Sequence, residues 1–103
     1  MLKFYVYELV IVPDGTICYV GKGSGRRMYN HRRYAVQPST LTQSYLYRKL
    51  SEVLVSGKTF EPRKVFETND EQVALIEEKR RIELYGLDAL FNSGFHSGIL
   101  AEQ

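Results

Sequence analysis

The strongest constraint on this chain is a short turn, Pro13-Asp14-Gly15, between two strand-like runs. Proline presets φ for a turn, and glycine readily takes the left-handed conformation. The run before the turn, KFYVYELVIV at 3–12, is apolar on both alternating faces, as in a central strand. The run after it, from Thr16 to about Lys22, should pair back onto the first. The fold is therefore expected to start from a β-hairpin.

The segment after the hairpin predicts two helices. Ser24 is a candidate N-cap for a helix over about Gly25 to Val36, which breaks before Pro38. Apolar residues at helical spacing predict a second helix over 41–56, which ends at Gly57.

The second half of the chain predicts one more strand and one more helix. FEPRKVFET at 60–68 is rich in strand-forming residues. A capping box, with Thr68 as N-cap and Glu71 at N3, then opens a helix that runs to Tyr85 before Gly86. The order ββααβα, a small sheet with helices around it, is an α/β arrangement.

Length and composition indicate one ordinary globular domain over residues 1–103. Hydrophobic residues make up 44% of the chain and charged residues 25%. No apolar run approaches a membrane span, and Met1-Leu2-Lys3 leads directly into strand-like sequence, so we expect no membrane partner and a cytoplasmic protein. The single cysteine, Cys18, cannot form an internal disulfide and is expected to be a buried strand thiol.

Charge is distributed unevenly. The segment between Asp14 and Glu52 has seven basic and no acidic residues, a net charge of +7, whereas the rest has seven basic and twelve acidic residues, a net charge of −5. Such a segment favours phosphate-bearing partners, although it is equally compatible with a solvated basic face. The candidate nucleic-acid-binding residues are Lys22, Arg26, Arg27, Arg32, Arg33, Arg48 and Lys49.

The glycines of GKGSGRR at 21–27 fit neither common nucleotide-binding motif. The spacing is G-x-G-x-G rather than G-x-G-x-x-G, and Gly23 stands where a P-loop needs Ser or Thr after Lys22. Glycines here could still let the backbone turn from a strand into a helix and approach a phosphate closely.

Two tyrosines are expected to flank this glycine segment. If the hairpin pairs about Asp14, Tyr7 faces Gly21, and Tyr19 projects on the same side as Tyr7. A one-residue slip, or a bulge at Gly15, would separate the two phenols. The alternative is that both tyrosines are simply core aromatics.

Two further candidates lie on the predicted helices. Arg27 and His31 are four residues apart and share one helix face, either in a site or in solvent. Glu78 lies on an apolar stripe of the last helix, where a carboxylate needs a partner. That partner could be Arg27, Arg81 or a hard divalent metal.

These features resemble the GIY-YIG nuclease domain family. The matching positions, in chain order, are YVY at 5–7, YVG at 19–21, Arg27-x-x-x-His31, Glu78 in the last helix, and Asn92 in LFNSG. The resemblance covers nearly the whole chain. Tyr5 departs from it, because the first family motif has glycine at this position.

The resemblance implies a small three-stranded antiparallel sheet surrounded by helices. It also implies cleavage of a nucleic-acid phosphodiester with one divalent metal, Mg²⁺ or Mn²⁺. On this basis the chain would be a metal-dependent endonuclease, with DNA as the expected substrate. No targeting domain is visible, so specificity would come from this domain, self-association or a partner.

The resemblance also assigns a task to each site residue. Glu78 would hold the metal, and Arg27 would grip the scissile phosphate. Tyr7 or Tyr19 would orient or deprotonate the attacking water, assisted by His31 or Lys22. A phenol is a poor base at neutral pH, so nearby positive charge must favour the phenolate. Gly21 and Asn92 would be structural residues beside the site, with Asn92 tying the tail to its wall.

Two other classes of function stay open at this stage. The chain could bind nucleic acid without cutting it, in which case binding would persist without metal-dependent cleavage. It could also be a protein-interaction domain whose basic face meets an acidic partner.

Overall fold

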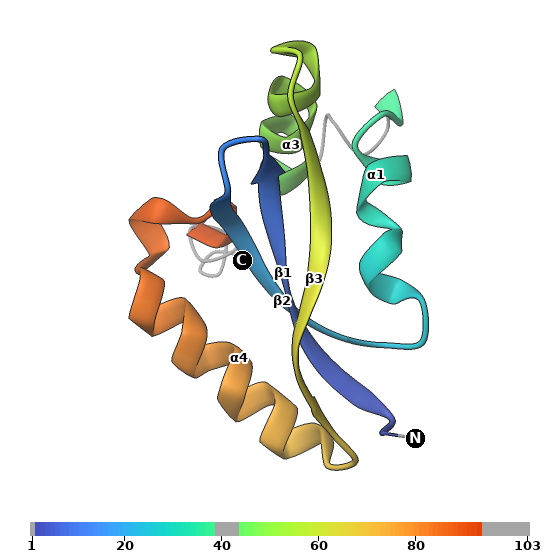
Figure 1. Ribbon diagram of the computed structural model, residues 1–103, viewed down its shortest axis with the longest axis vertical. Coiled ribbons are helices and arrows are strands. Elements are labelled where there is room, and N and C mark those ends of the chain that lie inside the picture. The colour runs from blue at the N-terminus through green and yellow to red at the C-terminus, as the bar shows by residue number, and fades with distance from the viewer. Residues whose placement is uncertain (1, 39–43, 94–103) are drawn as a thin grey trace.

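The computed structural model describes residues 2–38 and 44–93 of the chain. Three antiparallel strands, β1 (Phe4–Val12), β2 (Thr16–Ser24) and β3 (Thr59–Thr68), form one sheet in the order β2-β1-β3 (Figure 1). The first strand is therefore central, as its apolar faces predict. The small three-stranded sheet with helices around it confirms the expected α/β class.

The β1–β2 hairpin has the predicted register only at a distance from its turn. Tyr7 pairs with Gly21 and Leu9 with Tyr19, as expected for pairing about Asp14. The register shifts after Leu9, because Val10 pairs with Ile17 and Cys18 has no partner in β1. This bulge lies at Cys18 rather than Gly15, and it leaves Tyr7 and Tyr19 in contact, with ring centroids 6.1 Å apart.

The expected helix over Gly25 to Val36 is replaced by two short pieces. Ser24 is still part of β2 and does not cap a helix, and Gly25 has a φ of 59°. A 3₁₀ turn, η1 (Arg27–Tyr29), and a single turn of helix, α1 (His31–Tyr34), follow. Neither piece has a side-chain N-cap. The burial of Met28 and His31 against the sheet holds the two pieces in place instead.

The second predicted helix is α3 (Tyr45–Val55), which Ser44 caps by accepting a hydrogen bond from the backbone N–H of Tyr47. Residues 41–43 of that prediction lie outside the described residues, as does the tail after residue 93.

The last helix is α4 (Glu71–Tyr85), and its predicted N-cap is wrong. Asp70, rather than Thr68, caps the helix by accepting a hydrogen bond of 2.9 Å from the N–H of Gln72. Thr68 cannot do so because it still pairs with Phe4 in the sheet. Its hydroxyl instead accepts from the N–H of Asp70. Two 3₁₀ turns, η2 (Leu87–Ala89) and η3 (Phe91–Ser93), complete the described chain.

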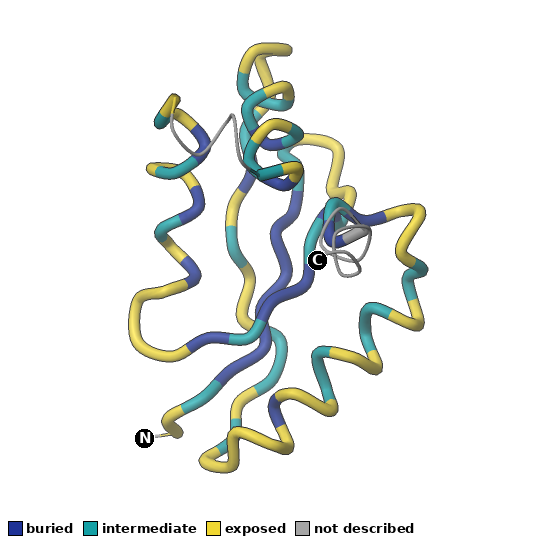
Figure 2. Tube along the Cα trace, turned by 180° about the vertical axis from the view of Figure 1, so that it is seen from behind, coloured by how far each residue is buried: buried dark blue, intermediate teal, exposed yellow. Residues whose placement is uncertain are grey.

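The two faces of the sheet carry different layers. One face packs Tyr5, Tyr7 and Leu9 of β1 against η1, α1 and α3, while the other packs Val6 and Val20 against α4. Figure 2 shows the buried residues running along the strands, whereas most of α4 is exposed or half-buried. None of the helices in the described ranges has the length and apolarity needed to cross a bilayer.

Candidate functional site

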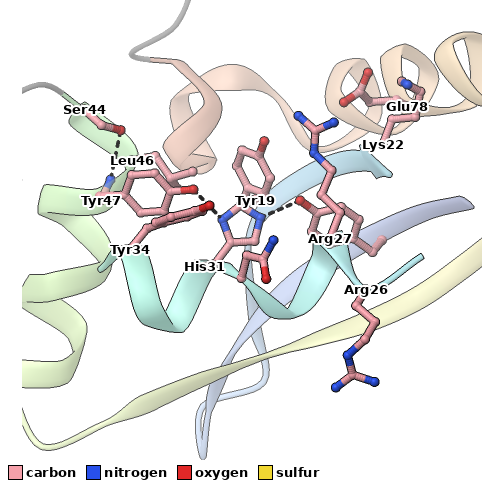
Figure 3. Close-up of a pocket in the computed structure, with 12 residues that line it drawn as sticks. Tyr19, Lys22, Arg26, Arg27, His31, Tyr34, Ser44, Leu46, Tyr47 and Glu78 are labelled. Atoms are coloured by element: carbon pink, nitrogen blue, oxygen red, sulfur yellow. Dashed lines mark hydrogen bonds between the residues drawn. The ribbon is translucent and has the colours of Figure 1, made fainter. Parts of the chain in front are cut away.

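A pocket of about 1020 Å³ opens between the β1–β2 hairpin, the η1–α1 segment, α3 and α4 (Figure 3). It collects side chains from both halves of the chain. All six residues expected to be catalytic line it: Tyr7, Tyr19, Lys22, Arg27, His31 and Glu78.

A chain of hydrogen bonds crosses the pocket floor. The hydroxyl of Tyr7 lies 2.5 Å from Nε2 of His31, and Nδ1 of His31 lies 3.1 Å from the hydroxyl of Tyr47. A neutral imidazole donates from one nitrogen and accepts at the other, so one tyrosine donates to the ring and the other accepts from it. His31 thereby connects a deeply buried phenol with one at the pocket rim.

Burial controls protonation in this chain of groups. It lowers the pKa of His31 to about 4, helped by the positive charge of Arg27. It also raises the pKa of Tyr7 and Tyr19 well above that of a free phenol. Arg27 works in the opposite direction on both phenols but does not outweigh burial. The expected phenolate is therefore not the resting state, and Tyr7, Tyr19 and His31 are all neutral at pH 7.

Arg27 is the arginine whose charge reaches the pocket centre. It affects the pKa of His31, of Tyr7 and Tyr19, and of Tyr47. In Figure 3 its guanidinium points towards Glu78, whereas Arg26 extends away from the other side chains. Arg26 instead stacks over the ring of Tyr29 at 5.2 Å.

Glu78 and Glu77 have different environments on α4. Glu77 is engaged by Arg80 and Arg81, at 2.7 Å in each case. Glu78 faces the pocket, and in the described part of the chain no ion pair engages it. Burial raises the pKa of Glu78, while the charge and backbone N–H of Lys22 act to lower it. Lys22 itself pairs with Glu71 at 2.8 Å.

Among the described residues that line the pocket, Glu78 is the side chain that could hold a hard divalent metal. Within residues 2–38 and 44–93, no three His, Cys, Asp or Glu side chains gather into a metal site of their own. Mg²⁺ commonly uses one or two carboxylates and completes its shell with water and substrate phosphates. The half-buried carboxylate of Glu78 meets that requirement.

The glycines of β2 leave space for neighbouring tyrosine rings. Gly21 and Gly23 lie inside the strand rather than in a turn. A Cβ at Gly21 would lie 2.7 Å from the ring of Tyr7 and 2.8 Å from that of Tyr19. A Cβ at Gly23 would lie 3.0 Å from Tyr5. The missing side chains make room for tyrosine rings.

Two residues fix the walls of the pocket. The hydroxyl of Tyr5 donates to the carbonyl of Gly25 at 2.9 Å and accepts from the N–H of Met28 at 3.1 Å. It therefore positions the turn that carries Arg27. The side-chain amide of Asn92 pairs with both the N–H and the carbonyl of Val20, at 3.0 and 2.9 Å.

Four of the predicted nucleic-acid-binding residues lie outside the pocket. Arg32 and Arg33 are exposed on α1, where Arg32 donates to Thr59 and Arg33 stacks over Tyr34. Arg48 is exposed on α3, and Lys49 pairs with Glu52 at 3.3 Å.

Sequence reasoning missed Tyr47 and Glu8. Tyr47 adjoins Leu46 on α3, and its helical position alone does not indicate contact with His31. Glu8 is buried on the opposite face of the sheet, where it accepts hydrogen bonds from Tyr85 and Arg81. A carboxylate in an otherwise apolar strand was the available signal.

Comparisons with known proteins give no match: no family model, no curated protein and no solved structure matches this chain.

Proposed function

We propose that the protein is a divalent-metal-dependent endonuclease that hydrolyses DNA phosphodiester bonds in this pocket. The observation that carries the proposal is the convergence of Arg27, Glu78 and the Tyr7–His31 pair on one cavity. A guanidinium, a metal-binding carboxylate and a proton-accepting pair can together catalyse phosphodiester hydrolysis. The resemblance of the sequence to GIY-YIG nucleases supports the same assignment.

Arg27 binds the scissile phosphate. Its guanidinium donates to the nonbridging oxygens and stabilises the charge that develops on them in the transition state. Its position beside Tyr7, Tyr19 and His31 keeps that charge close to the attacking water.

Tyr7 and His31 remove the proton from the attacking water. The hydroxyl oxygen of Tyr7 receives this proton as its own proton passes to Nε2 of His31, and the resulting hydroxide attacks phosphorus. This transfer needs no free phenolate at Tyr7. Because burial lowers the pKa of His31 to about 4, the imidazolium is a high-energy state that exists only during the step. His31 becomes an imidazolium, whose Nδ1–H donates to Tyr47.

Glu78 would hold the Mg²⁺ or Mn²⁺ ion. When bound, the metal supplies charge neutralisation at the phosphate and stabilises the leaving 3′ oxygen. The missing ion pair at Glu78 leaves its carboxylate available for this task within the described structure.

The test is cleavage of plasmid, linear, single-stranded and branched DNA and of RNA with Mg²⁺ or Mn²⁺, and with EDTA as a control. Glu78→Gln should abolish cleavage with little change in melting temperature or DNA binding. The matched variant is Glu77→Gln, which loses contacts to Arg80 and Arg81 and should melt earlier yet still cut. Cleavage by Glu78→Gln, or no cleavage of any substrate, would refute the proposal.

A second candidate is a nucleic-acid-binding module with the same pocket and no activity. The observation that favours it is the neutral state of the groups on the pocket floor, because burial opposes ionisation of both phenols. DNA binding that weakens steeply with salt, without cleavage in either metal, would identify this case.

A further inference from the structure

The side of α4 that is turned away from the sheet carries an apolar stripe. Val73, Ile76 and Leu84 on the helix are 39%, 67% and 67% exposed. The residues that pack under the helix are different ones: Ala74, Ile82 and Tyr85. A surface helix normally has one apolar face, so a second row of exposed apolar side chains is a candidate contact surface.

The centre of the stripe is symmetric about Arg80. Ile76 and Leu84 lie four residues on either side of it on the same helix. If a second α4 packs antiparallel with a two-fold axis at Arg80, Ile76 meets the second copy's Leu84 and Leu84 meets its Ile76. Each contact then occurs twice, as an isologous interface requires.

The charge at the centre of the stripe is already neutralised. Arg80 donates two hydrogen bonds to Glu77, at 3.0 and 2.7 Å. Its aliphatic stem can therefore contribute apolar contact without bringing an unpaired charge into the interface.

The residues beside the stripe carry opposite charges that could pair with those of a second copy. Lys79 and Glu83 are exposed on the same edge, and no ion pair of the described chain engages either of them. Lys before Glu at this spacing is the weaker order for a pair within one helix. In the antiparallel arrangement the same flanks meet, so Lys79 of each copy lies beside Glu83 of the other.

We propose that two copies of this chain associate through the outer stripe of α4, antiparallel and with a two-fold axis at Arg80. Glu78 lies on the opposite side of the helix from the stripe, so both pockets stay open. The pair then presents one pocket to each of two antiparallel strands. This last point rests on the proposed nuclease function, whereas the association itself does not.

The first test is sedimentation velocity of the full chain from micromolar to near-millimolar concentration. The wild-type chain should shift from monomer to dimer, and Ile76→Glu should weaken association by at least about tenfold. Val55→Glu is the matched control, because Val55 is 85% exposed on α3 and lies outside the stripe. A wild-type chain that stays monomeric, or equal weakening by Val55→Glu, would overturn the proposal.

The flanking charges test the pairing itself. Lys79→Glu and Glu83→Lys should each weaken self-association, because like charges then meet. A mixture of the two variants should associate again. Failure of the mixture to associate better than either variant alone would overturn the antiparallel arrangement.

Crosslinking tests the position of the axis. Arg80→Cys should give a disulfide dimer on mild oxidation, whereas Val73→Cys should not, because the two copies of residue 73 would lie roughly 21 Å apart along the helices. Cys18 is buried and does not compete. Glu78→Gln should dimerise like the wild-type chain, so a failure of the nuclease proposal remains distinguishable. Crosslinking at position 73 instead of 80 would contradict the proposal.

Discussion

Tyr7 and Glu8 are neighbours in β1, and they place polar groups on opposite faces of the sheet. The hydroxyl of Tyr7 contacts His31, which leads to Tyr47 at the pocket rim. The carboxylate of Glu8 accepts from the hydroxyl of Tyr85 at 2.5 Å and from Arg81 at 3.1 Å.

The two networks differ in where they end. Arg81 also binds Glu77, so the network of Glu8 closes on α4 and does not reach the pocket. It holds α4, and with it Glu78, against the sheet. Burial of a polar group therefore does not by itself indicate a functional site. The Tyr7 network is a candidate because it opens onto a cavity.

The largest expected loss of stability comes from breaking the Glu8 network. Glu8→Ala leaves Arg81 with Glu77 as its remaining partner, and we expect the free energy of unfolding to fall by about 3 to 4 kcal/mol. Chemical denaturation measures this loss. Glu61→Ala, which breaks an exposed pair with Arg63, should cost less than about 1 kcal/mol. Equal losses in the two variants would remove the structural role of Glu8.

Acid should destabilise the fold through His31, which belongs to the Tyr7 network. His31 has a pKa lowered to about 4 in the folded protein against 6.5 for the free side chain, so the unfolded chain binds a proton first. The associated stability is complete above pH 6.5 and is lost as the pH falls towards 4, by roughly 3 kcal/mol. Denaturation at several pH values measures this slope, and His31→Gln should flatten it. An unchanged slope in that variant would assign the acid sensitivity to other groups.

Replacing Arg27 should change the cleavage rate without changing the stability of the fold. Arg27→Ala should lower single-turnover cleavage by about 10²-fold, as loss of other electrostatic stabilisers does, with little change in melting temperature. Arg26→Ala is the matched control, because Arg26 extends away from the pocket centre. If both variants cut equally well, neither guanidinium acts at the phosphate.

Gly21 tests the packing of the pocket wall. A Cβ at this position would lie 2.7 Å from the ring of Tyr7, so Gly21→Ala should cost about 2 kcal/mol and displace that ring. At Gly23 the closest atom is 3.0 Å away, and Gly23→Ala should cost less. Thermal melting of the two variants gives the comparison. A more stable Gly21→Ala variant would mean that the tyrosines can move aside.

The smallest expected effect is at the pocket rim. Tyr47→Phe removes one hydrogen bond to Nδ1 of His31 and should cost about 1 kcal/mol of stability. It should also change the pH dependence of cleavage, because the tautomer of His31 is no longer fixed. Tyr34→Phe is the matched control, because it removes a hydroxyl that accepts from Arg33 and keeps the ring that packs edge-on against Tyr47. Identical pH profiles for wild type and Tyr47→Phe would confine Tyr47 to a packing role.

Much of the fold follows from local sequence. Pro13 and Gly15 predict the turn, and apolar residues on both faces of 3–12 predict a central first strand. Pairing about Asp14 then predicts that Tyr7 lies opposite Gly21. The bulge at Cys18 is not visible, because it depends on how both strands pack. Likewise Asp70 replaces Thr68 as N-cap because the sheet retains Thr68.

The sequence indicated which residues belong to the candidate site. It did not indicate which of their side chains touch. Spacing brought Arg27, His31 and Glu78 into consideration, and the pocket places them together. Tyr47 could not be assigned, because its contact with His31 depends on how α3 packs against α1. The reason for Gly21 was also hidden, since a glycine beside a phosphate and a glycine beside a ring look identical in sequence.

The side chain of Asn92 bonds to Val20 with the same donor and acceptor pair that a neighbouring strand would use. It therefore occupies part of the open edge of β2, where another chain could otherwise add a strand. The two residues are 72 positions apart, so this contact closes a long loop and should form late in folding. During synthesis, the first strands emerge from the ribosome long before Glu78 and Asn92. The nascent hairpin consequently has an unprotected edge and no complete pocket until almost all of the described chain has been made.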